Sequence, residues 1–425
     1  MKLLLRLILL LFPLGGAWLG WEVIRANRGR SAAAEAIRHE AWQQARVELF
    51  RYLRLHPADA QSRLMLAEAF ACDDSLNGDE SAKLAIDQLQ RIPDTSPWGV
   101  KARTQEGRLR FLVLNQPIQG ERLLRRALEL DPESFDANYM LWKLLDVTGR
   151  MHLAEPFVWK AFETSPIAER PLRMREWYQT EFSPAAGAAP LDEKMGFMGP
   201  KNESYLIPEL RRLQRFRLAE PDTAVAAAAL SRLFLRQGIR AQAQESLESA
   251  RLVAGALDDP YYVASWIALR MDLGEFEQAE ELFARWPGEH SGYEYWKWEG
   301  IICDEVRHDD RGAVAALEKA GAVWPGGLDW QLMFRKAHCL VRMKSDSQAD
   351  EARAQAASIE RMMEPDIQRS VGRALRHIED PEQVAVVVDF YRKLGRPREA
   401  DFWENHRIEQ ARARAPVATF GLSER

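Results

Sequence analysis

The chain has 425 residues, of which 58 are basic and 63 acidic, so its formal net charge is −5. This balance shows no basic excess of the kind that nucleic-acid-binding proteins carry, and no nucleic-acid partner is expected. With 47% hydrophobic and 28% charged residues, the composition is that of a folded protein. Its three cysteines, Cys72, Cys303 and Cys339, are widely spaced. This spacing excludes a disulfide framework and a zinc site built on paired CxxC motifs.

The first predicted element is a hydrophobic helix at the N-terminus. Residues 3–23 form an apolar run that, at about 1.5 Å per residue, matches the ~30 Å hydrocarbon core of a bilayer. Trp18 and Trp21 suit the aromatic belt of a membrane interface, so we interpret residues 1–24 as a signal anchor. This predicts a single-pass membrane protein with its main domain on the periplasmic side, although the flanking charges nearly balance and leave the orientation open. The run also fits a cleaved signal peptide, with cleavage near Ala17.

A repeat with a period of about 34 residues follows the apolar run. Pro132 recurs as Pro166, and alanines recur in one register further along the chain, at Ala243, Ala279 and Ala313. Within the unit, a glycine is followed five residues later by an alanine at Gly149 and Ala154, Gly238 and Ala243, Gly274 and Ala279, and Gly395 and Ala400. Glycine accepts the left-handed conformation that ends a helix, and alanine lets a second helix cross the first closely. The pattern predicts paired helices throughout.

These residues resemble the tetratricopeptide repeat (TPR). The unit from Glu133 to Pro166 matches the TPR pattern best, at Asn138, Leu141, Leu145, Gly149, Ala154, Val158, Ala161 and Pro166. The resemblance implies an all-α fold, a superhelical solenoid of antiparallel helix hairpins preceded by the single N-terminal hydrophobic helix. It implies two TPR-like arrays of about four units each, over residues 31–166 and 222–410.

The unit between the two arrays, residues 167–221, is interrupted by an insertion over residues 183–204. Pro184, Pro190 and Pro200 exclude a continuous helix in the insertion. A loop of this length inside a helical array is unusual, and we interpret it as a mobile spacer or as a binding element with Phe197 at its apolar tip. Beyond the second array, residues 411–425 lose the periodicity and are predicted to be a disordered tail.

The motifs of common enzyme classes are absent from the sequence. It has no phosphate-binding glycine loop, no HExxH helix, no GxSxG elbow and no zinc-ligand spacing. The most metal-like group is His308, Asp309 and Asp310 with Cys303 upstream, which we interpret as solvated residues of a hairpin turn. We therefore expect a non-enzyme with no cofactor and no metal site.

In TPR arrays the first helix of each hairpin lines the concave face. That geometry implies a protein or extended peptide as partner in the concave groove. It also implies a set of candidate partner-binding residues on the first helices, to which the aromatic stretch near Trp296 and the tip of the insertion are added: Tyr139, Lys143, Arg232, Arg236, Tyr261, Tyr295, Trp296 and Phe197.

The predicted function is that of a non-catalytic scaffold, tethered to the membrane through residues 3–23, that assembles proteins at the cell envelope. In outline the chain resembles bacterial envelope proteins that combine a signal anchor with TPR units. One alternative is a secreted soluble repeat protein that binds a polysaccharide or small ligand through the aromatic region around Trp296. A second alternative is an enzyme with an unrecognised site beside the insertion at residues 183–204.

Overall fold

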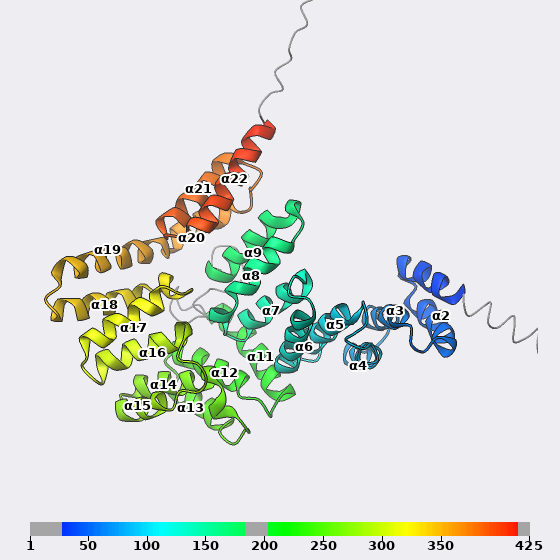
Figure 1. Cartoon of the computed structure of the whole chain (residues 1–425), viewed down its shortest axis with the longest axis horizontal. Helices are drawn as coiled ribbons and strands as arrows, with labels where there is room; N and C mark the ends of the chain where they lie inside the picture. Colours follow the sequence, from blue (N-terminus) through cyan, green and yellow to red (C-terminus); the bar gives the residue numbers. More distant parts are fainter. Residues whose placement is uncertain (1–27, 183–202, 415–425) are drawn as a thin grey trace, which may run out of the picture. The chain divides into compact units, whose positions relative to one another are not determined.

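The computed structural model describes residues 28–182 and 203–414 (Figure 1). All regular elements within these two ranges are helices, and none is a strand. The described chain forms two compact units that divide after Leu141. The predicted apolar helix at residues 3–23, most of the insertion with Phe197, and residues 415–425 of the predicted tail lie outside the described residues. Residues 411–414 of that tail belong instead to the last helix, α22 (Pro397–Arg414). The predicted array limits at residues 31–166 and 222–410 stay predictions.

The first unit begins with a helix over residues 28–38. It continues with α2 (Trp42–Leu55), α3 (Ala60–Ala71), α4 (Gly78–Gln90), α5 (Gly99–Leu112) and α6 (Pro117–Leu130). The next helix, α7 (Phe135–Val147), spans the division between the two units.

The second unit contains the rest of the described helices. Its first part comprises η1 (Met151–Leu153), α8 (Glu155–Thr164), η2 (Ile167–Glu169), α9 (Arg170–Phe182), α11 (Glu203–Ala219), α12 (Val225–Arg236) and α13 (Arg240–Glu248). Then follow η4 (Ala256–Asp258), α14 (Pro260–Leu273), α15 (Phe276–Ala284), α16 (Gly292–Glu305) and α17 (Asp310–Gly321). The last part comprises η5 (Gly326–Leu328), α18 (Trp330–Arg342), α19 (Asp346–Met362), α20 (Pro365–Ala374), α21 (Pro381–Lys393) and α22 (Pro397–Arg414).

Consecutive helices pack as hairpins, which confirms the all-α repeat predicted from the sequence. The pairs with the most extensive contact are α5 with α6, α16 with α17, α18 with α19, and α21 with α22. The first helices of neighbouring hairpins also touch, α12 with α14 and α14 with α16. Stacked hairpins therefore share one core, as Ile267, Phe283 and Trp298 show by packing together from α14, α15 and α16.

The glycine and alanine positions have the roles that the sequence predicts. Gly238, Gly274 and Gly395 have φ of 73°, 76° and 70°, the left-handed conformation that ends a first helix. Ala279 and Ala243, each five residues after such a glycine, are 0% exposed at the helix crossing. Because the side chain at the crossing is only that of an alanine, the two helices of each hairpin approach closely.

Four turns adopt the same left-handed conformation without glycine. Glu40, Asn115, His308 and Lys344 have φ of 56°, 57°, 51° and 60°. The backbone N–H that follows Lys344 donates to the carbonyl oxygen of Leu340 at 2.9 Å, as the N–H after Gly274 does to Arg270. This hydrogen bond satisfies a free carbonyl at the helix end, which offsets the cost of a left-handed residue that carries a Cβ.

The predicted single-pass membrane localisation is contradicted. Across residues 28–182 and 203–414, no helix combines the length and the apolar character that a membrane span requires. The longest of these helices, α22, carries charged residues along its whole length. Residues 3–23, on which the prediction rested, lie outside the described residues.

Candidate functional site

The first helices of the second unit bring two predicted site residues together. Arg232 of α12 donates from Nη1 and Nη2 to Glu294 Oε1 and Oε2 of α16, at 2.7 and 3.1 Å. Its Nε donates to Ser265 Oγ of α14 at 2.9 Å, and its guanidinium lies 4.2 Å from the ring centroid of Tyr261. Burial opposes ionisation of Glu294, but the Arg232 guanidinium holds the pKa of that carboxyl well below its usual range.

His152 of η1 covers this part of the first-helix face. Its ring stacks on Tyr261 with the centroids 6.2 Å apart, and its Nδ1 lies 3.8 Å from Glu294 Oε1. Burial lowers the pKa of His152 to about 4, so the imidazole is neutral at physiological pH. Tyr261 itself is only 4% exposed. The partner-binding role of Arg232 and Tyr261 stays a prediction, and their burial favours a structural role.

The other predicted site residues lie apart from this cluster. Tyr295 is 9% exposed and stacks on Phe283 in the core between hairpins, with ring centroids 5.2 Å apart. Trp296 keeps part of its surface, and Lys319 Nζ lies 3.9 Å from its ring centroid. Arg236, at the end of α12, is also partly exposed.

Tyr139 and Lys143 both lie on α7, on either side of the division between the units. Within the first unit, the ring of Tyr139 stacks on Phe135 with a centroid distance of 5.7 Å. Within the second unit, Lys143 Nζ lies 4.0 Å from the ring centroid of Trp142 and 3.9 Å from Glu176 Oε2.

An open groove lies between α16 and α18, further along the first helices. It encloses about 760 Å³ and is lined by residues from the end of α16, the turn to α17 and one face of α18: Asp304, Glu305, His308, Asp310, Gln331, Phe334, Arg335, His338 and Arg342. We call it the α16–α18 groove. The residues of α18 recur at helical spacing, so they form one stripe along that helix.

Ion pairs fix the two arginines of the groove. Arg335 Nη1 donates to both Asp304 and Glu305, and Arg342 donates from Nε to Asp310 Oδ1 at 2.7 Å and from Nη2 to Asp304. Asp304 thus accepts from both guanidiniums. Burial alone would raise the pKa of Asp304, but the two neighbouring guanidiniums lower it, so the carboxylate stays charged.

The same carboxylates belong to a group with metal-ligand chemistry. Ligand-type atoms of Asp304, Asp310 and Cys339 lie within 4.8 Å of one another. Arg342 bonds all three of these residues, including Cys339 Sγ at 3.2 Å, so a guanidinium already supplies the positive charge at this point. Burial raises the pKa of the Cys339 thiol to about 12, which disfavours the thiolate that a metal would require.

The α16–α18 groove presents hydrogen-bond donors to solvent. Among the described residues, Nε and Nη2 of Arg335 and the exposed rings of His308 and His338 have no hydrogen-bond partner. Phe334 adds a half-buried aromatic ring to the same stripe of α18. Because Asp304 holds the arginines in place, the groove offers donors in fixed positions together with an apolar contact.

Of the groove residues, the sequence pattern points only to His308 and Asp310, as part of a polar hairpin turn. The predicted set of partner-binding residues includes none from α18, although Gln331, Phe334, His338 and Arg342 recur there at spacings of three and four residues. That stripe, together with the adjacent acidic pair Asp304 and Glu305 at the end of α16, was the available signal.

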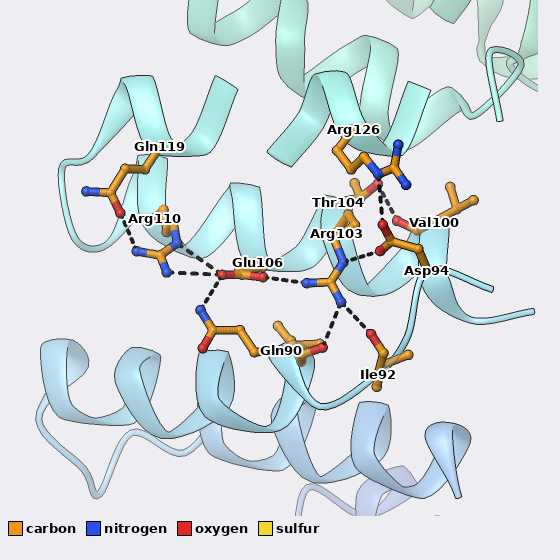
Figure 2. A network of polar contacts seen from close by, with 11 residues as sticks. Gln90, Ile92, Asp94, Val100, Arg103, Thr104, Glu106, Arg110, Gln119 and Arg126 are labelled. Carbon is orange, nitrogen blue, oxygen red and sulfur yellow. Dashed lines mark hydrogen bonds and ion pairs between the residues drawn. The ribbon is translucent and has the colours of Figure 1, made fainter. Parts of the chain in front are cut away.

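A second polar network, in the first unit, joins α4, α5 and α6 (Figure 2). Glu106, with its side chain 2% exposed, accepts from Arg103 at 2.9 Å and from Arg110 at 3.1 Å. Arg103 also donates to Asp94 Oδ1 at 2.9 Å, and Arg126 donates to Asp94 Oδ2 at 2.8 Å. Arginines of the same unit pair with both carboxylates, those of Glu106 and Asp94. We therefore interpret this network as a structural connection between hairpins.

Comparisons with known proteins give no family for this chain. No protein-family model matches it, and no curated protein matches it. Solved structures do match. One match is to the crystal structure of the APC/C hetero-tetramer Cut9–Hcn1, with 13% sequence identity and a TM-score of 0.38. The match covers 91% of this chain and 87% of the matched chain.

Two further structures match at a similar level. The human IFIT1 dimer with PPP-AAAA is 12% identical, covers 89% of each chain and has a TM-score of 0.31. The pilF structure from Pseudomonas aeruginosa is 18% identical, covers 55% of this chain and 95% of its own, and has a TM-score of 0.27. Since all three scores are below 0.5, the helical-repeat assignment rests on the hairpins of this chain itself.

Proposed function

We propose that the protein is a non-catalytic helical-repeat scaffold that binds a segment of a partner protein in the α16–α18 groove. The observation that carries this proposal is the stripe on α18. Asp304 holds Arg335 in place, and the remaining N–H donors of Arg335 face an open groove together with the side chains of His338 and Phe334. Extended or helical segments commonly dock on the first-helix face of stacked hairpins through side chains of this kind.

The groove suits a partner segment that supplies acceptor groups and one apolar side chain. Arginine and aromatic residues dominate the binding energy of many protein interfaces. Here the carboxylates of Asp304 and Asp310 fix the arginine side chains before binding, so less conformational freedom is lost when a partner arrives. Of the residues predicted from the sequence, we propose the partly exposed Arg236 and Trp296 as secondary contacts.

Two rival functions have weaker support. An enzyme site beside the insertion at residues 183–204 stays a prediction, since most of that segment lies outside the described residues. A reactive thiolate near the groove is disfavoured, because burial raises the pKa of Cys339 to about 12 and that of Cys303 to about 11. Ligand binding through the aromatic region near Trp296 needs open rings, but Tyr293, Tyr295 and Trp298 are all less than 10% exposed.

Site-specific photo-crosslinking tests the proposal. We expect p-benzoylphenylalanine in place of the exposed Gln331 to crosslink a partner protein in cells that produce the full chain. The matched control places the same amino acid at Asp350, whose side chain is 76% exposed on α19 and does not line the groove. Crosslinks that are equal at both positions, or absent at position 331, would contradict the assignment of the groove.

The identified partner then allows a binding measurement with purified proteins. His338→Asp places a negative charge among the groove donors without disturbing a described contact, so we expect the Kd to rise about tenfold or more. His39→Asp, at a side chain that is 72% exposed in the first unit, is the control and should leave the Kd unchanged. A groove variant that binds as well as the wild type would remove His338 from the interface.

A further inference from the structure

The second unit has contacts that a simple stack of hairpins lacks. In such stacks each repeat contacts only its neighbours. Here α9 contacts α22, which forms with α21 the hairpin at the end of the described chain; we call this pair the C-terminal hairpin (labelled in Figure 1). Phe182 packs against Phe390 with ring centroids 5.3 Å apart, and Phe162 packs against Phe402 at 5.0 Å.

Charged side chains lie at the centre of this contact. Arg396, just before α22, pairs with Glu181 Oε1 of α9 at 2.9 Å and with Glu399 of α22. Trp324 Nε1 donates to the same Glu181 oxygen at 3.0 Å. The side chains of Glu181 and Glu399 are 0% and 2% exposed, so one guanidinium serves two buried carboxyl groups.

The second oxygen of Glu181 is unsatisfied. Glu181 Oε2 is buried and has no hydrogen-bond partner among the described residues, and neither does the nearby hydroxyl of Tyr391. With both carboxyls ionised, the cluster would bury a net negative charge, which is costly away from water. One proton on Glu181 makes the cluster neutral and turns Oε2 into a hydroxyl. The geometry therefore favours a protonated Glu181 in the closed contact.

We propose that Glu181, Arg396 and Glu399 form a proton-linked clasp that holds the C-terminal hairpin on α9 while Glu181 is protonated and loosens when it ionises. The titratable groups that act electrostatically on Glu181 come from four helices or their ends: Glu155 of α8, Tyr178 of α9, Tyr391 of α21, and Arg396 and Glu399 beside or in α22. Arg396 is the only cation among these described groups, so the proton supplies the missing positive charge.

The direction of the pH dependence follows from the burial of Glu181. Burial raises the pKa of Glu181 to about 8, although Arg396 opposes the shift. An exposed glutamate loses its proton near pH 4.5, about the value for the unfolded chain. The stabilisation is therefore complete below about pH 4.5 and is lost as the pH rises to about 8.

Hydrogen exchange of the full chain between about pH 6 and pH 9 tests the clasp. After correction for the intrinsic exchange rate, we expect protection of α21 and α22 to fall by up to about tenfold per pH unit up to about pH 8, and to level off above it. Glu181→Gln mimics the protonated side chain, so its protection should not depend on pH. Amides of α5 and α6, in the first unit, are the internal control. A wild-type profile as flat as that of the variant would overturn the proposal.

Glu399→Gln provides a second, independent variant. Removing this carboxylate leaves one anion for Arg396, which should lower the pKa of Glu181 and move the levelling-off below about pH 8. Circular dichroism establishes that each variant is folded. If Glu181→Gln does not fold, the exchange profile of Glu399→Gln alone tests the proposal. Protection that levels off at the same pH as in the wild type would contradict the proposed coupling between Glu181 and Glu399.

Discussion

Trp177 Nε1 donates a hydrogen bond to Glu399 Oε1 at 3.4 Å, although 222 residues separate the two in the sequence. Trp177 is 0% exposed, and its ring also lies 5.0 Å from that of Trp324. One side chain of α9 thus contacts both the C-terminal hairpin and the turn that precedes α18. The second unit therefore depends on contacts between distant repeats as well as between neighbours.

Removing this side chain should strongly destabilise the second unit. We expect Trp177→Ala to lower the free energy of unfolding by about 3–5 kcal/mol, because it leaves a cavity in a fully buried site. Trp296→Ala is the matched control, since that ring is partly exposed and should cost less. Urea denaturation followed by circular dichroism measures both variants. Equal losses would show that the two tryptophans are equally packed, contrary to the structure.

A close helix crossing in the first unit gives a second prediction. A Cβ on Gly107 of α5 would lie 3.0 Å from the carbonyl oxygen of Gly120 on α6 and 3.0 Å from Leu124 Cγ. Gly107→Ala should therefore force the helices apart at a cost of about 1–3 kcal/mol, which opposes the gain of about 1 kcal/mol in helix propensity. We expect a lower melting temperature.

The control for this crossing is Gly78→Ala at the start of α4, where a Cβ would meet nothing within 4 Å. That change should leave the melting temperature unchanged or raise it slightly. A Gly107→Ala variant that behaves like Gly78→Ala would contradict the close approach of α5 and α6.

The hairpins themselves were predictable because their signals are local. Glycine in the left-handed conformation and a buried alanine five residues later mark a hairpin in any stacked array, and Gly274 with Ala279 does so here. The turn at Lys344 carries no glycine, and the turn at His308 is indicated only by its polar residues, so neither has a comparable mark. Their conformation depends on hydrogen bonds at the helix end.

The candidate site was predictable only in part, because its contacts join distant residues. The first-helix register groups Arg232 with Tyr261, and the guanidinium lies 4.2 Å from the ring centroid of that tyrosine. It could not show that His152 covers them or that Glu294, 62 residues from Arg232, neutralises the arginine. The α16–α18 groove was missed for the same reason, since Asp304 and Arg342 come together only through the packing of two hairpins.

The polar network of Figure 2 predicts a large effect from one carboxylate. Glu106→Ala leaves Arg103 and Arg110 without their shared, buried partner, so we expect a loss of about 3–5 kcal/mol in the free energy of unfolding. Glu129→Ala breaks only an exposed pair with Arg126 and should cost less than about 1 kcal/mol. Chemical denaturation compares them, and similar losses would mean that Glu106 is not held as described.

The three thiols should differ in reactivity. Cys72 is exposed, whereas Cys303 and Cys339 are 3% and 0% exposed and burial raises the pKa of their thiols to about 11 and about 12. We expect a single fast phase with Ellman's reagent in the native protein, followed by two slow thiols. Cys72→Ser should abolish the fast phase. A fast phase that survives this change would show that a buried thiol is accessible.

The buried His152 predicts a loss of stability in acid. Burial lowers the pKa of its imidazole from 6.5 in the unfolded chain to about 4 in the folded protein. The unfolded chain therefore binds the proton first, so stability is full above about pH 6.5 and falls as the pH drops towards about 4, by on the order of 3 kcal/mol. His152→Phe keeps a ring against Tyr261 but cannot titrate, and should remove this part of the pH dependence. The measurement is the free energy of unfolding in urea across this pH range, and equal slopes for wild type and His152→Phe would refute a neutral, buried imidazole.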